Sequence, residues 1–377
     1  MKKIIILSLH LGYGGIEKAI TSLANTLIDK YKVEIISTYK LYDKPAFAID
    51  KRVKISYLMH EKPNKEIIKE KINNLSGIKS FIDLIKEGLY SIKVLYKRKK
   101  LMINKVKKED ADIFISTRDF HNKILSKYVD DNKVKIGWEH NYKIDDNKYI
   151  KRLMRSIKGL NYLVLPTKEL RDFYKDKTKV TCIYIPLILD YIPLIKSNLA
   201  TNNILAIGRL SKVKGYSSLI DVFKLVNDKV KESHLTIIGD GEERTIISDK
   251  IKEHKLQNNV TLTGFLTPKQ IEKHMLNASV FVITSYSESF GLVVLEAMSY
   301  GIPCVVFSSA RGCLEMVKDN VNGFVIEDRD KIKMAEALVK IITNKELNKR
   351  LASATAKVIE KYKPDNVKKH WLNLLSR

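Results

Sequence analysis

The sequence is poor in cysteine and in long apolar runs. Its 377 residues contain three cysteines, Cys182, Cys304 and Cys313, an odd set without C-x-x-C spacing. This set argues against a disulfide framework and a zinc site, and it fits a reducing cytoplasm. No stretch approaches the ~20 apolar residues that a membrane-spanning helix needs. The short apolar run 4–9 leads into glycines and not into a cleavage pattern, so we expect a first strand there and no secretion signal.

Acidic residues are scarce relative to basic ones. Lys and Arg number 68 against 43 Asp and Glu, which gives a net charge of +25. Such an excess calls for an anionic partner, although a lysine-rich proteome would produce the same total. The position of the charge is more informative. From Lys86 to Lys108, basic residues alternate with apolar ones against the single acid Glu87. This composition predicts an amphipathic basic helix that lies on an anionic membrane surface.

Motifs of several common protein classes are missing. The glycines at 12, 14 and 15 lack the G-x-G-x-x-G spacing, and no acid closes the next strand-like run, which argues against a nicotinamide enzyme. The polar candidates form no Ser-His-Asp set, and no Asp-x-Asp sequence among them suggests a divalent cation. We therefore expect neither a metal nor a cofactor. We also find no nucleic-acid motif or aromatic stacking platform, so nucleic acid is not an expected partner.

The length suits two domains of ~150–190 residues, and 45% hydrophobic residues supply two cores. Apolar, β-branched runs alternate with helical segments, which predicts an α/β fold with mainly parallel sheets. The strand-like runs are 4–9, 33–37, 53–58, 112–116, 134–137, 162–165 and 180–185, then 204–207, 235–238, 260–262, 280–284, 304–307 and 324–326. The joint should fall within 186–203, so we expect an N-terminal domain at 1–188 and a second domain at 203–363. Ligands of such sheets bind at the carboxyl ends of the strands.

Two glutamates eight positions apart, Glu288 and Glu296, mark the most informative segment. An apolar run at 278–283 predicts a buried strand before them, and a helical pattern follows from about Phe290. The free N–H groups and dipole of a helix start favour a phosphate in this loop. Glu288 would lie beside that anion, and Glu296 would lie ~8 Å further along the helix. Both side chains can accept hydrogen bonds from sugar hydroxyls.

Further candidates follow other expected strands. Arg209 and Lys214, five positions apart after the run 204–207, can both reach one diphosphate. Such cations would stabilise the charge on a departing nucleoside diphosphate. Gly14 and Gly15 allow a loop to bring backbone N–H groups close to a ligand. His140, at the end of the run 134–137, can hydrogen-bond to a sugar hydroxyl or a phosphate.

These motifs, in this order, resemble the retaining glycosyltransferases of family 4. The resemblance implies two facing Rossmann-like domains of the glycosyltransferase-B type, an interdomain cleft, and a C-terminal helix at 364–377 that packs back on the N-terminal domain. It implies that Arg209 and Lys214 hold the leaving diphosphate, that Glu288 holds the donor sugar and that Glu296 holds the ribose. His140 would complete the catalytic group. The donor-binding positions implied are Gly14, Gly15, Gly239, Phe265, Phe290, Gly291, Leu292 and Glu296.

The same resemblance implies a metal-independent transfer of a hexose, with retained configuration, from a nucleotide-diphosphate sugar. UDP is the expected nucleotide, and the expected acceptor is a hydroxyl of a glycan or lipid-linked oligosaccharide, as in synthesis of capsule or lipopolysaccharide. We expect a cytoplasmic protein, peripherally associated with the inner face of the plasma membrane. Two alternatives stay open at this point: a nucleotide-sugar 2-epimerase of the same architecture, and a non-catalytic basic binding protein.

Overall fold

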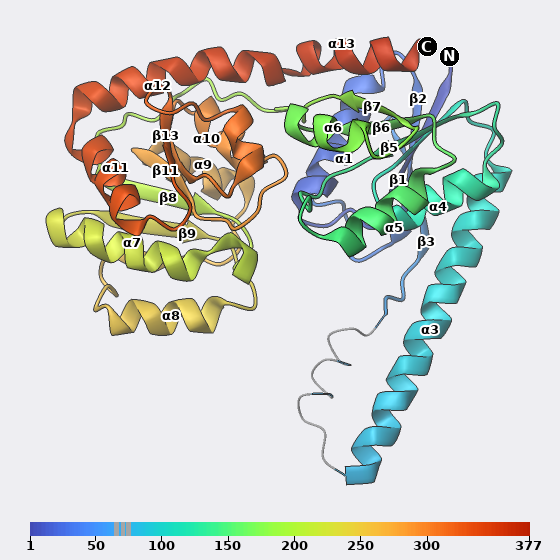
Figure 1. The fold of residues 1–377 in the computed structure, drawn as a ribbon, viewed down its shortest axis with the longest axis horizontal. Coiled ribbons are helices and arrows are strands. Elements are labelled where there is room, and N and C mark those ends of the chain that lie inside the picture. Colours follow the sequence, from blue (N-terminus) through green and yellow to red (C-terminus); the bar gives the residue numbers. More distant parts are fainter. Residues whose placement is uncertain (64–67, 69–71, 73–76) are drawn as a thin grey trace. The chain divides into compact units, whose positions relative to one another are not determined.

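The computed structural model describes residues 1–63, 68, 72 and 77–377, which form two compact units. Unit 1 comprises Met1–Leu165, Glu169–Tyr184 and Leu372–Arg377. Unit 2 comprises Pro166–Lys168 and Ile185–Trp371. Each unit is an α/β structure built on its own parallel sheet, as Figure 1 shows.

Unit 1 contains a seven-stranded sheet in the order β3-β2-β1-β4-β5-β6-β7, with parallel pairing throughout. Its strands are β1 Lys3–Ser8, β2 Lys32–Tyr39, β3 Lys54–Met59, β4 Ile113–Ser116, β5 Val134–Trp138, β6 Tyr162–Leu165 and β7 Thr181–Tyr184. Its helices are α1 Gly15–Leu27, α3 Gly77–Lys108, α4 Asp119–Tyr128, α5 Asn147–Ile157 and α6 Lys168–Lys175. The strand order reverses between β1 and β4, so the carboxyl ends of these two strands flank a topological switch point.

Unit 2 contains a six-stranded parallel sheet in the order β10-β9-β8-β11-β12-β13. Its strands are β8 Asn203–Ile207, β9 His234–Ile238, β10 Val260–Leu262, β11 Val280–Ile283, β12 Cys304–Phe307 and β13 Gly323–Ile326. Its α-helices are α7 Tyr216–Lys229, α8 Arg244–Glu253, α9 Pro268–Leu276, α10 Leu292–Ser299, α11 Lys331–Thr343, α12 Lys345–Ile359 and α13 Pro364–Leu375. Short 3-10 turns are η1 Lys212–Lys214, η2 Arg311–Glu315 and η3 Glu360–Tyr362. The switch point of this sheet lies between β8 and β11.

All thirteen strand-like runs of the sequence are strands in the structure, with ends shifted by one or two residues. The agreement has a physical cause, because strands covered by helices on both faces read as continuous apolar runs. The central strands bear this out: Ile4 to Leu7 in β1 and Cys304 to Phe307 in β12 are buried along their whole length. The α/β architecture with two parallel sheets is therefore confirmed.

The segment expected to join the domains is part of unit 2. Ser197 donates from its backbone to the carbonyl of Tyr300 at 2.9 Å and from its hydroxyl to that of Ala278 at 2.6 Å. Within the same segment, the apolar residues Leu187 to Leu189 are buried. The C-terminal helix α13 is divided, since Leu372–Arg377 are grouped with unit 1 and Trp371 with unit 2.

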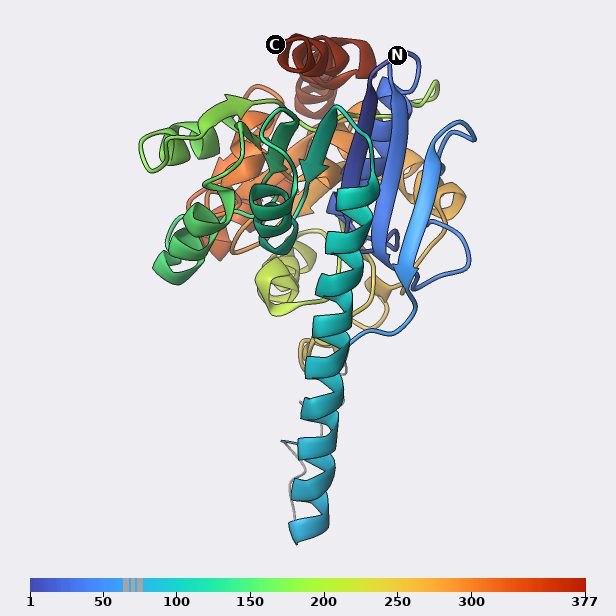
Figure 2. The ribbon, with the colours of Figure 1, turned by 90° about the vertical axis from the view of Figure 1, so that its right-hand side faces the viewer.

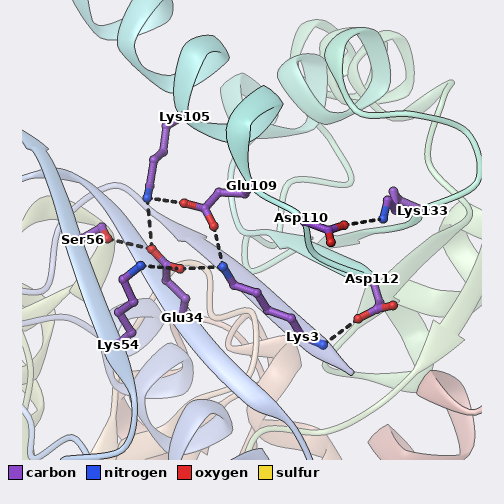
Figure 3. A network of polar contacts seen from close by, with 9 residues as sticks. All are labelled: Lys3, Glu34, Lys54, Ser56, Lys105, Glu109, Asp110, Asp112 and Lys133. Carbon is purple, nitrogen blue, oxygen red and sulfur yellow. Dashed lines mark hydrogen bonds and ion pairs between the residues drawn. The ribbon is translucent and has the colours of Figure 1, made fainter. Parts of the chain in front are cut away.

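A buried carboxylate ties the end of α3 to the first three strands of unit 1 (Figure 3). Glu34 on β2 accepts a 2.7 Å hydrogen bond from Ser56 and forms ion pairs with Lys3 at 3.0 Å and Lys105 at 3.3 Å. Lys105 also pairs with Glu109. Burial alone would raise the pKa of Glu34, but the Ser56 hydrogen bond and the lysines lower it to about 2. The carboxylate therefore stays ionised and holds the C-terminal end of α3 against the sheet.

Candidate functional site

The candidate residues of unit 2 lie at the carboxyl ends of its strands. Arg209 and Lys214 follow β8, and Glu288 follows β11, so they flank the switch point of the sheet. Arg209 is exposed and forms no ion pair or side-chain hydrogen bond with any residue that the structure describes. Its guanidinium is thus available to a ligand at the position where parallel α/β sheets bind them.

Lys214 is placed by a tight turn that only glycine allows. Gly215 has φ of 67°, and a Cβ there would collide with the carbonyl oxygen of Thr284. In return, the Thr284 hydroxyl donates to the carbonyl of Lys214 at 3.0 Å. The backbone N–H of Tyr286 donates to the carbonyl of Val213 at 2.8 Å. The turn after β8 and the loop after β11 are therefore held together at several points.

The lysine and the first glutamate of the candidate site are direct partners. Lys214 Nζ donates to Glu288 Oε1, and the Ser285 hydroxyl donates to the same oxygen at 3.0 Å. The Glu288 side chain is 11% exposed and that of Lys214 23%, so the pair is largely shielded yet still open to solvent. The sequence placed both residues near one ligand but did not predict that they contact each other.

Arg329, which the sequence analysis did not single out, braces the same loops. Its guanidinium donates to the carbonyl of Thr284 at 2.8 Å and to the Ser309 hydroxyl at 3.2 Å. It also stacks 3.7 Å from the ring centre of Tyr286. Stacking together with a hydrogen-bonding fork suits arginine and not lysine. The sequence could have pointed to Arg329, because this residue follows β13 at a strand's carboxyl end.

The helix after β11 begins later than expected. We expected its start near Phe290, but α10 starts at Leu292, after Gly291 in the left-handed conformation with φ of 86°. The Phe290 ring is buried and packs edge-on against Tyr362 with centroids 5.6 Å apart. Leu292 is buried as well. The side chains of Phe290 and Leu292 therefore belong to the core, and what they can offer a ligand is backbone N–H groups.

Glu296 lies one turn inside α10. Four residues separate it from the helix start, which corresponds to a rise of ~6 Å and not the ~8 Å expected. Its side chain is half-buried.

Gly239 and Phe265 follow β9 and β10 in the same sheet. A Cβ on Gly239 would collide with the carbonyl oxygen of Gly208, and its φ of 138° lies in the region that favours glycine. Packing of the two strand ends is thus sufficient to explain this glycine. The Phe265 side chain is 72% exposed.

Unit 1 carries the remaining candidates around its own switch point. Gly14 caps α1, which begins at Gly15, and a Cβ on Gly14 would collide with the Glu17 carboxylate. Glu17 is buried and forms ion pairs with Arg118 at 3.4 Å, after β4, and with His10 at 3.7 Å. The sequence analysis missed this ionic cluster. The signal that could have revealed this cluster was the acidic residue Glu17 on the buried face of α1.

His140 lies beside this cluster, after β5. Its ring is buried against Trp138, with centroids 4.5 Å apart, and Nε2 has no hydrogen-bond partner among the described residues. Burial, with a contribution from the charge of Arg118, lowers the pKa of His140 to about 3. The imidazole is therefore neutral at pH 7, and one buried nitrogen is available for a hydrogen bond to a ligand.

The described residues contain no cluster of His, Cys, Asp and Glu that could hold a metal ion. The chain has Asp-x-Asp sequences at 110–112 and 328–330, and the second of them includes Arg329. Their carboxylates are engaged elsewhere. Asp110 pairs with Lys133 at 3.1 Å, and Asp328 pairs with Arg329 at 2.8 Å. Asp330 caps α11.

Comparison with known proteins identifies the segment that carries most of these groups. The family described as "Glycosyl transferases group 1" matches residues 194–358. Residues 194–358 are therefore similar to the group 1 glycosyltransferases. An uncharacterized glycosyltransferase of Haemophilus influenzae is 25% identical over 383 residues, covering 100% of both chains. The poly(ribitol-phosphate) alpha-N-acetylglucosaminyltransferase of Staphylococcus aureus is 32% identical over 171 residues, 45% of this chain and 34% of that protein.

A further relative matches the same part of the chain. The poly(glycerol-phosphate) alpha-glucosyltransferase of Bacillus subtilis is 32% identical over 171 residues, 45% of this chain and 25% of that protein. The chain therefore spans the full length of the Haemophilus protein but about a third or less of the two polymer-modifying enzymes.

Solved structures show the same fold over the whole chain. S. aureus TarM, solved with fondaparinux, alpha-GlcNAc-glycerol and UDP, has a TM-score of 0.81 at 19% identity, covering 100% of both chains. Anabaena HepE, solved with UDP and glucose, has a TM-score of 0.76 at 15% identity, also covering 100% of both chains. The chain thus has the glycosyltransferase-B fold, with two Rossmann-like parallel sheets.

Proposed function

We propose that the protein is a retaining glycosyltransferase that moves a hexose from a nucleotide-diphosphate sugar, with UDP as the nucleotide, to a hydroxyl of a glycan or lipid-linked oligosaccharide. The observation that carries this proposal is the grouping of Arg209, Lys214 and Glu288 at the switch point of unit 2. Two cations beside an α-helix start suit a diphosphate, and a partly shielded carboxylate suits sugar hydroxyls.

In the proposed mechanism, each residue has a separate task. Arg209 and Lys214 stabilise the negative charge that develops on the departing nucleoside diphosphate, which is usually the largest single catalytic contribution. Glu288 orients the donor sugar, and Glu296 binds the ribose. Neutral His140 offers its buried nitrogen to a sugar or phosphate oxygen. The acceptor hydroxyl attacks from the face that the diphosphate leaves, and its proton passes to the departing phosphate oxygen as the bond between that oxygen and the sugar breaks. No metal is required, since the two cations neutralise the diphosphate.

The acceptor is proposed from the relatives. Two of them are named as transferases that add α-linked sugars to poly(glycerol-phosphate) and poly(ribitol-phosphate), and another is named for amylovoran biosynthesis. A transferase that makes an α-linkage from an α-linked donor retains configuration. We therefore place the reaction in bacterial surface-polysaccharide synthesis, at the inner face of the plasma membrane. No helix among the described residues is long and apolar enough to cross a membrane.

The test is incubation with a panel of UDP-sugars, with and without lipid-linked oligosaccharide and polyol-phosphate acceptors, followed by NMR of the anomeric carbon. Transfer or slow hydrolysis with retained configuration supports the proposal. Interconversion of the free nucleotide sugar at C2, without transfer, would instead identify a 2-epimerase. If neither UDP nor any donor binds, the proposal is wrong and the alternative of a non-catalytic basic binding protein is favoured.

A further inference from the structure

The long helix α3 has two apolar faces, and the residues that the structure describes cover only one of them. Val94, Met102 and Val106 are buried against unit 1, where Val94 packs with Tyr39 and Met59. Figures 1 and 2 show that the first half of α3 extends away from the sheet of this unit. The buried face is therefore concentrated in the second half of the helix.

The second apolar face is an exposed stripe along the first half. It consists of Phe81, Ile85, Leu89, Ile92 and Tyr96, all exposed. Successive spacings of four, four, three and four residues place these side chains within a sector of ~80° at 100° per residue. Ile92 is 64% exposed and Tyr96 70%, whereas Val94, on the opposite side, is 4% exposed. A stripe of this length is unusual on a water-exposed surface.

A row of lysines runs beside the stripe. Lys86, Lys93 and Lys100 are seven positions apart, so they lie almost in line, next to the apolar sector. Lys93 and Lys100 form no ion pair with any described residue, and Lys86 has only an exposed contact to Asp83 at 3.5 Å. The positive charges of Lys93 and Lys100 are therefore not neutralised by any described residue.

Other basic residues of the segment 86–108 do have structural partners, which narrows the membrane surface expected from the sequence. Arg98 stacks 3.9 Å from the ring centre of Phe120, and Lys97 pairs with Glu61 at 2.8 Å. Lys105 belongs to the Glu34 network of Figure 3. The surface available to a partner is thus the stripe, which ends at Tyr96, and the lysine row, which ends at Lys100.

We propose that α3 is a membrane-docking helix that lies in the plane of an anionic bilayer, with the Phe81–Tyr96 stripe at the boundary between headgroups and acyl chains and the lysine row on the lipid phosphates. Apolar and basic sectors side by side on one helix are what such an interface binds. A second copy of α3 would fit poorly, because it would bring two strongly basic helices together and each has only Asp83 and Glu87 to offset them. The proposal supplies the membrane partner of the enzyme proposed above, but its test needs no activity.

The test is sedimentation with vesicles of phosphatidylglycerol and phosphatidylcholine, and with vesicles of phosphatidylcholine alone. The wild-type protein should bind the anionic vesicles. The variant K86Q/K93Q/K100Q should lose roughly a hundredfold in partitioning, at about fivefold for each lysine. The variant L89Q/I92Q should lose roughly tenfold in partitioning to the vesicles for each apolar side chain replaced. A matched control, K345Q/K349Q/K357Q on the exposed face of α12, removes the same charge and should bind as the wild type does.

Each other outcome counts against the proposal. Wild-type binding by both α3 variants would overturn it, as would an equal loss in the α12 control. If sedimentation velocity shows that the wild type self-associates and that L89Q/I92Q does not, the stripe is an interface between copies. UDP affinity in the absence of vesicles should be the same in all variants, so a failure here is separate from a failure of the proposed glycosyl transfer.

Discussion

Lys214 and Glu288 form an ion pair that joins the turn after β8 to the loop after β11 in unit 2. Each is the other's counter-ion in the protein without substrate. A bound diphosphate would draw Lys214 toward its oxygens, and this would free Glu288 to accept hydrogen bonds from the donor sugar. The two proposed binding events are therefore coupled through one contact.

This coupling should appear in a double-mutant cycle. Lys214→Met and Glu288→Gln should each lower stability, but together by less than the sum, with a coupling of about 0.5–3 kcal/mol. Urea unfolding of the four proteins measures it. The exposed pair Lys224–Asp228 serves as a control, since exposed ion pairs of this spacing contribute little. Strict additivity at Lys214 and Glu288 would contradict the pairing.

Arg209→Ala should lower kcat by about 10²–10³ while leaving the fold intact. The side chain is exposed and has no partner among the described residues, so its loss removes charge stabilisation and no packing. Steady-state kinetics with a UDP-sugar, together with a thermal melt, measure both effects. Lys212→Ala, an exposed cation in the same turn, is the matched control and should retain activity. Wild-type turnover in R209A would remove this residue from the leaving-group site.

The two glutamates should differ in their effect on free UDP. Glu296→Gln should weaken the binding of UDP by about 1.5–3 kcal/mol, because the ribose is part of UDP and a charge-assisted hydrogen bond is lost. Glu288→Gln should not weaken the binding of UDP, because the proposed ligand of Glu288 is the sugar. The same variant should lower the rate of transfer. Titration calorimetry with UDP decides between them. Equal losses of UDP affinity in both variants would refute this division of labour.

Transfer should persist in excess EDTA. Two cations stand where a metal ion would otherwise neutralise the diphosphate, so removal of divalent ions should leave the rate within about twofold. The assay compares initial rates with EDTA alone and with added Mg²⁺ or Mn²⁺. Complete loss of activity that either ion restores would show that the metal-independent mechanism is wrong.

Glu34 should make the stability of unit 1 sensitive to acid. Its pKa is about 2 in the folded protein and near 4.5 in the unfolded chain. The folded pKa is the lower one, so the stabilisation is present above pH 4.5 and is lost as the pH falls toward 2. The shift corresponds to about 3 kcal/mol.

The comparison of Glu34→Gln with the wild type tests this assignment. The variant should be less stable at pH 6 but should lose less stability between pH 6 and pH 3.5, as followed by urea unfolding. Asp110→Asn breaks the exposed pair with Lys133 drawn in Figure 3 and should leave the pH dependence unchanged. If E34Q and wild type respond to acid in parallel, the network does not lower the pKa of Glu34.

The sequence by itself determined the strands, the two parallel sheets and which loops carry polar candidates. Local patterns suffice for this, because buried parallel strands are apolar along their length and the ligand-binding loops follow them. Arg209, Lys214, Glu288 and Glu296 were all proposed as site residues in this way. The helix start was placed two residues early, because the left-handed Gly291 delays α10 and buries the Phe290 ring.

Only the tertiary structure decided which of these groups contact one another. The Lys214–Glu288 pair, the bracing by Arg329 and the Glu17–Arg118 contact join residues that are 20 to 101 positions apart, and no local pattern encodes such distances. The same holds for α3. Its composition predicted a basic amphipathic helix, but burial is a property of the packed fold. Only packing shows that Val94 and Met102 face the protein while Leu89, Ile92 and Tyr96 face outward.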